Sequence, residues 1–544
     1  MDGTARLTMA GIDIAVVAAY LVGIVGLGLW AWARRRKRAA AAPASSEYFL
    51  AGGSLRWPVI GLALFSTNIS TIHLVSLAQE GYVNGLAYGN FEWMAAFLLI
   101  VLALFFAPFY IRARVATLPD FLEKRYSRAA RDWLAVLSIV SAVFIHIGFS
   151  LYTGAVVLNG LFGIDINVSI LATALLTGLY TIVGGLLAVV MTESVQTIIL
   201  ILGSACVLVI GLAKAGGWAA LAASVEPVKM TILRTAAETP TLPWYAVFLG
   251  YPVIGLWYWC ADQTIVQRVL GARDERHARL GPLFTGFIKI LPVFLFVLPG
   301  LIGYALVAQG KLPAPRTSAD VYSLLVNNLL PVGLKGVVAA ALLAALMSTV
   351  SGALNSIATL FTLDLYKRWR PRTSERRLTL VGRLVTFVGM VVAILWSPFV
   401  SHFQSLFQGI TAVICYIAPP ITAVFIWGVL WKKASAAAAK TTLMIGSGLG
   451  LAVFLLDWFK AETGWNVPSM MATFYLFVIC SAVLVVVSLK RPHRHTAESE
   501  KLVWANPLEA VRGPWAAGAA ALLDYRVVSV LLFAVMVALY IVFA

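Results

Sequence analysis

Charged residues are scarce in this chain. Lys, Arg, Asp and Glu make up 12% of its 544 residues, whereas hydrophobic residues make up 61%. Soluble globular proteins carry roughly 25% charged residues. A soluble fold of this length could not hide so much apolar surface, but a protein in a bilayer can keep an apolar exterior. The composition therefore excludes an ordinary soluble protein and predicts an integral membrane protein.

Motifs of metal sites and hydrolases are absent. The four cysteines lie inside apolar segments without CxxC spacing, so neither a zinc site nor a disulfide framework is indicated. The chain has no HExxH, no GxSxG and no clustered metal ligands, which argues against a membrane-embedded enzyme. A membrane sensor would need a soluble output domain, but the longest polar stretch, about 490–524, is a basic linker. These absences favour a transporter.

Acidic residues are also few: 24, against 41 basic residues and a net charge of +17. The basic residues fall in short loops between apolar spans, which is typical of cytoplasmic loops facing anionic lipid and not of a nucleic-acid surface. The first apolar run, about 11–32, is too long for a signal-peptide core, and five basic residues follow it at 34–38. We expect a first helix that is retained.

About 14 apolar segments are long enough to cross the bilayer. They cover approximately residues 10–33, 56–80, 88–110, 132–160, 166–184, 188–213, 243–262, 281–309, 332–366, 378–398, 403–431, 437–457, 469–489 and 525–544. Basic clusters occupy alternate loops, at 34–38, 112–131, 268–279, 367–377, 432–433 and 490–494. If these loops are cytoplasmic, the protein lies in the plasma (inner) membrane with both termini outside. The alternative is one miscounted helix, which would move one terminus to the cytoplasmic side.

Two of these spans contain helix-breaking residues. The second span includes the polar run 66–71, and the seventh contains Gly250, Pro252 and Gly255. Irregular backbone at membrane depth is tolerated only where it is buried in protein or lines a cavity. The breaks are five spans apart, as expected if each opens one unit of an inverted repeat with a binding site at the bilayer midplane. The predicted division is an N-terminal helix with a basic loop (1–55), a first repeat (56–214), a second repeat (243–431) and C-terminal flanking helices (432–544).

Ionisable residues within or near the spans mark candidate sites. The clearest are His73, Glu92, Glu193 and Lys289. A charge at the bilayer centre costs roughly 2.5–3.5 kcal/mol on insertion scales, so such residues usually face an interior cavity. Glu92 and Lys289 could hydrogen-bond a polyhydroxyl solute or form a structural ion pair. His73 follows Asn68 by about one turn and could face the same cavity, although a packing role is an alternative.

Small and hydroxylated residues fill the segment 344–352. Small residues let helices approach closely, which is one interpretation. The other is a sodium site, because a hard cation prefers several oxygen ligands. Hydroxyls of Ser348 and Thr349, with carbonyls freed near Ser66 and Ile69, could supply them.

Five stretches of the chain resemble the sodium/solute symporter family, and most closely its sodium/glucose and inositol branch. They are NISTIHLVSLAQEGYVNGLAYGNFEWM (68–94), TLPDFLEKRYS (117–127), GGLLAVVMTESVQT (184–197), WYWCADQTIVQR (257–268) and AALMSTVSGALNSIATLFTLDLY (344–366). The resemblance implies an all-α membrane protein with a leucine-transporter-type fold: a five-plus-five inverted-repeat core, broken helices at the midplane and flanking helices.

The resemblance also implies individual roles. The sodium ligands would be the carbonyls of Ser66, Ile69 and Ala345 and the hydroxyls of Ser348 and Thr349. The solute-binding set would include Asn68, His73, Glu92, Trp259 and Lys289, with Thr411 at a further position of the pocket. Tyr258, held by Asn68, would be the inner gate, and Leu77, Phe91 and Phe407 would form the outer lid. Ser351 and Glu193 are candidates for a second sodium site.

Three positions depart from the sodium/glucose pattern. Glucose and galactose carriers typically have Gln where this chain has Thr411, and Asn or Thr where it has Gly255. Glu193 stands where the family usually has Asp. The resulting hypothesis is a sodium-coupled symporter, not an enzyme, for a monosaccharide or related polyol. It would work by alternating access, with Na⁺ as the coupled ion and a monomer sufficient. A carrier of sialic acid or another carboxylate is the alternative, because Lys289 could pair with a carboxylate whereas Glu92 would oppose it.

Overall fold

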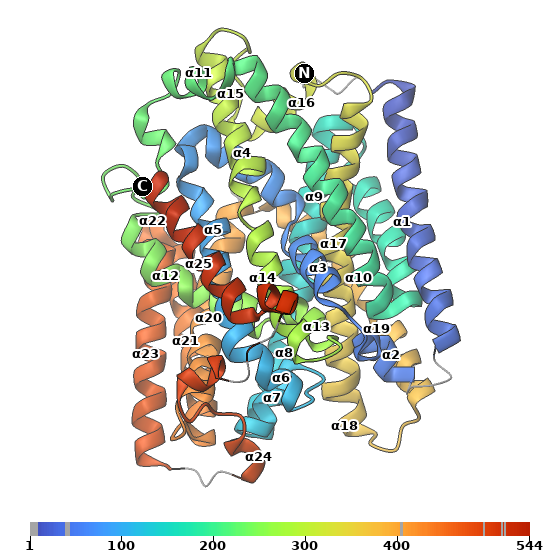
Figure 1. Ribbon diagram of the computed structural model, residues 1–544, viewed down its shortest axis with the longest axis vertical. Coiled ribbons are helices and arrows are strands. Elements are labelled where there is room, and N and C mark those ends of the chain that lie inside the picture. The colour runs from blue at the N-terminus through green and yellow to red at the C-terminus, as the bar shows by residue number, and fades with distance from the viewer. Residues whose placement is uncertain (1–8, 39–43, 403–405, 493–495, 513–514, 516–517) are drawn as a thin grey trace.

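The computed structural model describes residues 9–38, 44–402, 406–492, 496–512, 515 and 518–544. Across these residues every regular element is a helix (Figure 1), and β-pairing is confined to one isolated bridge between Leu55 and Ala272. The prediction of an all-helical protein is confirmed.

Eleven helices within the described residues are long and apolar enough to cross a membrane. They are Gly11–Arg34, Thr71–Arg112, Arg128–Gly160, Ile166–Ala215, Glu275–Ala308, Leu334–Trp369, Glu375–Ser401, Ile410–Leu430, Ala436–Trp458, Ser469–Lys490 and Tyr525–Val542. This count differs from the 14 spans expected, because some expected spans join into one helix and others contain shorter helices. The eleven helices therefore do not confirm the expected number of 14 membrane crossings.

The helix α10 (Ile166–Ala215) shows how two expected spans join. Its 50 residues cover both 166–184 and 188–213, and the backbone leaves helical geometry at Gly185, with φ 66° and ψ −161°. A Cβ atom at Gly185 would lie 2.5 Å from the carbonyl oxygen of Tyr48. Glycine is needed here both for the positive φ and for this close approach.

The helices between residues 57 and 430 include those that line the site described below. In the first half they are α3 (Trp57–Asn68), α4 (Thr71–Asn84), α5 (Asn90–Val101), α6 (Ala107–Arg112), α7 (Leu118–Arg125), α8 (Arg128–Ser141), α9 (Gly148–Phe162) and α10. In the second half they are α12 (Trp244–Leu256), α13 (Gln263–Leu270), α14 (Glu275–Ile288), α15 (Leu298–Ala308), α16 (Val321–Leu329), α17 (Leu334–Leu360), α19 (Glu375–Trp396) and α20 (Leu406–Leu430).

The remaining helices flank these two groups. They are α1 (Gly11–Arg38), α2 (Ala44–Leu50), α11 (Gly217–Ala223), α18 (Lys367–Trp369), α21 (Ala436–Trp458), α22 (Lys460–Thr463), α23 (Ser469–Lys490), α24 (Ala497–Glu500) and α25 (Tyr525–Val542). In Figure 1, α1 lies along one edge, and α21, α23 and α25 lie on the opposite side.

The first predicted break is present. α3 ends at Asn68 and α4 begins at Thr71, while Ile69 (ψ 112°) and Ser70 (ψ 174°) between them are extended. The polar run at 66–71 breaks this helix because Ser70 caps the new helix: Ser70 and His73 form a reciprocal capping box. Backbone carbonyls around residues 66–69 are thereby released from helical pairing.

The second break lies later than the sequence suggested. Pro252 is inside α12, which continues through a π-helical turn at 257–261, and the backbone becomes extended only at Asp262 (ψ 123°). The expected break at Gly250, Pro252 and Gly255 is therefore wrong. The helix restarts at Asp262 because its carboxylate caps α13, accepting a hydrogen bond from the Thr264 amide at 2.7 Å.

The helix α17 lies at the centre of the bundle. It packs most extensively on α10 and also contacts α1, α3 and α19, and nearly all of its side chains are buried. Its first turn is capped from another helix: the buried Asp13 of α1 accepts hydrogen bonds from the amides of Gly333 (2.7 Å) and Gly336 (2.8 Å). A negative charge at a helix N-terminus is favourable, so α1 fixes the end of α17.

The loops predicted to share one side of the membrane lie at one end of the molecule. Helices α7 and α18, which belong to basic segments, and α24, which follows the basic segment 490–494, lie at the lower end in Figure 1. Helices α11 and α16, which belong to the loops poor in basic residues, lie at the upper end. The alternation of charge along the sequence therefore corresponds to two ends of the bundle.

Candidate functional site

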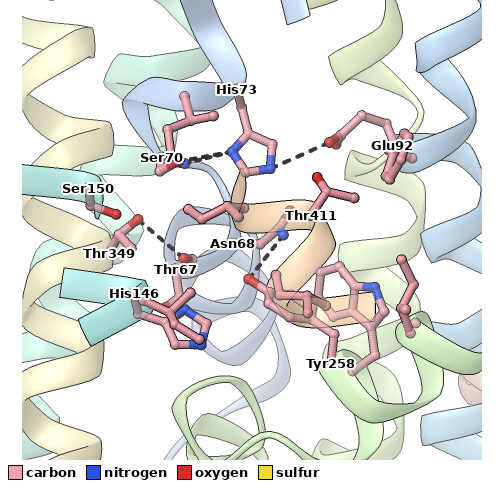
Figure 2. A pocket seen from close by; sticks show the side chains of 18 of the residues that line it. Thr67, Asn68, Ser70, His73, Glu92, His146, Ser150, Tyr258, Thr349 and Thr411 are labelled. Carbon is pink, nitrogen blue, oxygen red and sulfur yellow. Dashed lines mark hydrogen bonds and ion pairs between the residues drawn. The ribbon is translucent and has the colours of Figure 1, made fainter. Parts of the chain in front are cut away.

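A cavity of about 160 Å³ lies beside the break between α3 and α4. Its walls come from that break, from α5 and α12, from the junction of α8 and α9, and from α20 (Figure 2). The residues that line it are Thr67, Asn68, Ser70, Ile72, His73, Leu77, Phe91, Glu92, Ile145, His146, Ser150, Tyr251, Ile254, Gly255, Tyr258, Trp259, Thr349, Ile410, Thr411 and Ile414. The cavity thus combines aromatic and aliphatic surfaces with a few polar groups, as small-molecule sites do.

A polar network joins four helices on one side of the cavity. Lys289 forms a buried ion pair with Glu92 and donates a hydrogen bond to the amide oxygen of Asn68 at 2.6 Å. The amide nitrogen of Asn68 donates in turn to the hydroxyl of Tyr258 at 3.2 Å. Both members of the ion pair are almost fully buried, and such charges persist only when paired. The network holds Asn68 in a fixed orientation at the end of α3.

His73 completes this side of the cavity. Its Nδ1 accepts a hydrogen bond from the Ser70 amide at 3.1 Å, so the ring proton of the neutral form is on Nε2. Nε2 points toward Glu92, 3.8 Å from Oε1 (Figure 2). The imidazole therefore presents a donor to the cavity next to the carboxylate.

Most of the predicted solute-binding and gating residues meet at the cavity. Among them Asn68, His73, Glu92, Trp259, Thr411, Tyr258, Leu77 and Phe91 line it. Lys289 lies behind this surface and acts through Glu92 and Asn68, with its ammonium 5.6 Å from the centre of the Trp259 ring. Phe407 lies outside the residues whose side chains the structure describes.

Sequence reasoning missed three polar lining residues, His146, Ser150 and Tyr251. His146 is 3.4 Å from the Asp262 carboxylate, and Tyr251 donates to the carbonyl of Phe91 at 2.7 Å. A histidine inside the apolar span 132–160 was the available signal for His146. Nothing in the sequence around Ser150 or Tyr251 marks either residue as part of a cavity.

Gly255 does not leave an empty place. A Cβ atom there would lie 2.9 Å from the Tyr251 ring and 3.0 Å from Leu98. A longer side chain at this position would have to displace one of them. Tyr251 and Leu98 therefore occupy the space that an Asn or Thr side chain would need.

Five oxygen atoms gather where α17 meets the first break. The Ser348 hydroxyl donates to the carbonyl of Ser66 (2.8 Å) and also approaches that of Ala345 (3.0 Å). The Thr349 hydroxyl lies 3.2 Å from the carbonyl oxygen of Ala345 and 3.5 Å from that of Ile69. The residues predicted as sodium ligands thus converge on one buried point. Uncharged oxygens suit a hard monovalent cation, and the described residues hold no cluster of His, Cys, Asp or Glu that would fit another metal.

The candidates for a second sodium site have other partners. The Glu193 carboxylate forms a buried ion pair with Arg268 and accepts from the Thr67 hydroxyl at 2.9 Å. A Cβ atom at Gly352 would lie 2.5 Å from the Arg268 guanidinium, so the glycine makes room for that group. Ser351 donates to the carbonyl of Ser348 at 3.0 Å. A guanidinium therefore already neutralises the charge of Glu193.

A second cavity, of about 320 Å³, shares Phe91 and Thr411 with the first. Its other walls include Thr241 from the loop before α12, Asp457 near the end of α21, and Lys460 and Trp465 from the α21–α23 connection. Phe91 stacks on Tyr88, with ring centres 5.9 Å apart. Phe91 and Thr411 thus stand between the two cavities.

Known proteins similar to this chain are sodium-coupled carriers. The chain is 34% identical over 525 residues to sodium/glucose cotransporter 1 of Ovis aries, covering 88% of this chain and 78% of that protein. It is also 34% identical over 499 residues to sodium/myo-inositol cotransporter 2 of Mus musculus, covering 86% of this chain and 73% of that protein. These similarities confirm the predicted resemblance and the prediction of a carrier in place of an enzyme.

Solved structures resemble the fold. A substrate-bound, outward-open Na⁺-coupled sialic acid symporter superposes with a TM-score of 0.77 at 21% identity, over 90% of this chain and all of that one. Mhp1, a nucleobase-cation-symport-1 family transporter, gives a TM-score of 0.53 over 85% of this chain and 98% of that one, at 14% identity. The predicted leucine-transporter-type fold is confirmed.

A family model covers most of the chain. Residues 48–446 match the model of the sodium:solute symporter family. This range contains the cavity, both helix breaks and the oxygen cluster on α17. The chain belongs to the sodium:solute symporter family.

Proposed function

We propose that this protein is a sodium-coupled symporter for a neutral monosaccharide or related polyol. Sugar and inositol carriers are among its relatives at 34% identity. The cavity combines aromatic faces, which suit the apolar side of a sugar ring, with Asn68, His73 and Glu92, which suit its hydroxyls.

The observation that carries this proposal is that the two candidate sites share one break in the backbone. The Asn68 side chain belongs to the cavity network, whereas the carbonyl of the next residue, Ile69, faces Thr349 in the oxygen cluster. A cation that orders the carbonyls at this break also orients Asn68. Binding of one ligand therefore favours binding of the other, which is the coupling that symport requires.

The energy available from one ion is sufficient for concentrative uptake. Moving one positive charge inward across 100 mV yields about 2.3 kcal/mol. A tenfold sodium gradient adds about 1.4 kcal/mol. Together they support an accumulation of roughly 500-fold at perfect coupling.

A carboxylate substrate such as sialic acid is disfavoured by the charges at the cavity. None of the described residues that line it is Lys or Arg. The nearby ammonium of Lys289 is already paired with Glu92, whose carboxylate lines the cavity. The carboxylate of such a substrate would therefore lie near the negatively charged carboxylate of Glu92, which repels it.

Alternating access would use the surfaces above and below the cavity. We assign the outer lid to Leu77, Phe91 and Phe407 and the inner gate to Tyr258. The two repeats would be 56–214 and 243–431, and a monomer would be the transport unit. The protein would lie in the plasma (inner) membrane, with the basic end of the bundle on the cytoplasmic side and both termini outside. The positive-inside rule and the position of the basic helices at one end support this orientation.

The test is uptake by proteoliposomes holding the full chain. Radiolabelled monosaccharides, inositols and sialic acid would be offered with an inward sodium gradient or a matched potassium gradient. We expect sodium-dependent accumulation of a neutral sugar or cyclitol. Sialic acid uptake in preference to every neutral solute would identify the carboxylate alternative, and uptake equal in both gradients would contradict sodium coupling.

A further inference from the structure

A basic crevice opens between α1, the start of α3 and α10. Its volume is about 360 Å³, and it is lined by Trp30, Ala31, Arg34, Ser54, Leu55, Arg56, Val59, Leu187 and Met191. Two of the nine residues are arginines and none is acidic. The crevice shares no lining residue with the solute cavity.

The two arginines of the crevice are available to a ligand. Both are exposed, and no acidic side chain among the described residues forms an ion pair with either. The Arg34 guanidinium lies over the Trp30 ring, 5.2 Å from its centre, and Trp30 is 48% exposed. Tryptophan and arginine of this kind are typical of the boundary between hydrocarbon and headgroups.

The backbone around the second arginine is fixed. The Leu55 amide donates to the carbonyl of Gly271 at 3.0 Å, and the Leu55 carbonyl accepts from the Arg273 amide at 2.9 Å. Arg56 is therefore held at the rim of the crevice as the residue before α3. Ser54 beside it is exposed, and its hydroxyl donates to the carbonyl of Ala51 at 2.7 Å.

The walls of the crevice change from polar to apolar. Arg34, Ser54 and Arg56 form the polar part, whereas Val59 of α3 and Leu187 and Met191 of α10 form the apolar part. A ligand that matches this surface has an anionic, oxygen-rich head joined to a hydrocarbon tail. Basic pockets between membrane helices on the cytoplasmic side bind anionic lipid headgroups.

We propose that this crevice is a binding site for one anionic glycerophospholipid. The guanidinium groups of Arg34 and Arg56 bind the phosphate and the anionic headgroup, since arginine pairs with phosphate oxygens through two parallel hydrogen bonds. An acyl chain lies along Val59, Leu187 and Met191. The lipid bridges α1 to α3, the helix whose far end carries Ser66 and Asn68. This inference depends on the membrane location and not on the identity of the transported solute.

Native mass spectrometry of the purified full chain tests this site. Phosphatidylglycerol and phosphatidylcholine would be titrated separately into wild type, Arg34→Gln/Arg56→Gln and the control Arg372→Gln/Arg376→Gln. The control removes the same charge from two exposed arginines near α18 and the start of α19. We expect the first phosphatidylglycerol adduct of the crevice variant to be weaker by about tenfold, with the control like wild type and phosphatidylcholine unaffected.

Several outcomes would overturn the site. Unchanged phosphatidylglycerol affinity in the crevice variant, or an equal loss in the control, would leave only general attraction between charges. Displacement of the lipid by millimolar inorganic phosphate would assign the crevice to a soluble anion. If the double variant does not fold, Arg34→Gln and Arg56→Gln would be measured singly, and wild-type affinity in both would also contradict the proposal.

Discussion

The hydroxyl oxygen of Ser348 lies 2.8 Å from the backbone carbonyl oxygen of Ser66 and so joins α17 to the end of α3. Ser66 is the third-last residue of α3, just before the break. A cation at this point would bind both helices at once. The relative position of α3 and α17 would then depend on whether the site is occupied, which gives sodium a direct effect on the cavity beside it.

Replacing Ser348 by Ala should weaken sodium binding. A small cation needs several oxygens to replace its hydration shell, so loss of one hydroxyl should raise the sodium concentration for half-maximal uptake by about tenfold, or about 1.4 kcal/mol. Solute affinity at saturating sodium should change less. Ser351→Ala, one turn further along α17, is the matched control. Equal sodium dependence of uptake in wild type and Ser348→Ala would show that the Ser348 hydroxyl is not a sodium ligand.

The Glu92–Lys289 pair should be needed for solute binding as well as for stability. Removing one partner leaves a buried unpaired charge, so Glu92→Gln and Lys289→Met should each destabilise the protein, by about 3–5 kcal/mol. The double variant removes both charges and should recover stability. We expect it to melt like wild type and to bind no measurable solute by equilibrium dialysis. Wild-type affinity in the stable double variant would assign the pair to structure alone.

Thr411→Gln should change the order of preferred solutes. Thr411 lines the cavity, and a longer amide there could hydrogen-bond ring hydroxyls that Thr411 does not reach. A site that hydrogen-bonds a hydroxyl discriminates strongly against analogues without it. We expect glucose or galactose uptake to rise relative to the wild-type substrate. Ala412→Gln is the control, because Ala412 lines only the second cavity of these two. The same order of solutes in Thr411→Gln and wild type would place residue 411 outside the solute contacts.

One charge should cross the membrane with each neutral solute. Glu193 is neutralised by Arg268 within the protein, so it offers no free carboxylate to a second sodium ion. Reversal potentials measured at several sodium and solute gradients should give a ratio of one, unchanged in Ser351→Ala. A ratio of two in wild type, falling to one in that variant, would restore Ser351 and Glu193 as a second site.

The sequence was most informative where a residue type conflicts with its surroundings. Polar residues 66–71 inside an apolar span predicted the first break correctly, because such a run is costly in lipid unless it ends a helix or lines a cavity. The same reasoning marked Glu92 and Lys289 as buried charges, and the structure shows the ion pair that was one of their two interpretations. The hydroxyls of α17 came near the first break as expected, since small residues allow that approach.

Other features depend on contacts that sequence patterns do not show. Pro252 stays inside α12, and the break moves to Asp262, where a capping carboxylate is available. Gly255 departs from the sodium/glucose pattern, and Tyr251 and Leu98 fill the space beside it. The pairing of Glu193 with Arg268 joins residues 75 positions apart, and nothing local in the sequence indicates it. The join of two expected spans into α10 has a related cause, because Gly185 turns the chain within a continuous apolar stretch.

The central claim, that sodium and solute cross together, is tested most directly by running the coupling in reverse. Proteoliposomes would contain equal sodium on both sides, with the membrane voltage clamped at zero by potassium and valinomycin. An inward gradient of the transported sugar or cyclitol would be the sole driving force, and entry of radioactive sodium would be measured. We predict net sodium entry that stops when the solute gradient is removed and is strongly reduced in Ser348→Ala at low sodium. Solute entry without any net movement of sodium would contradict the account.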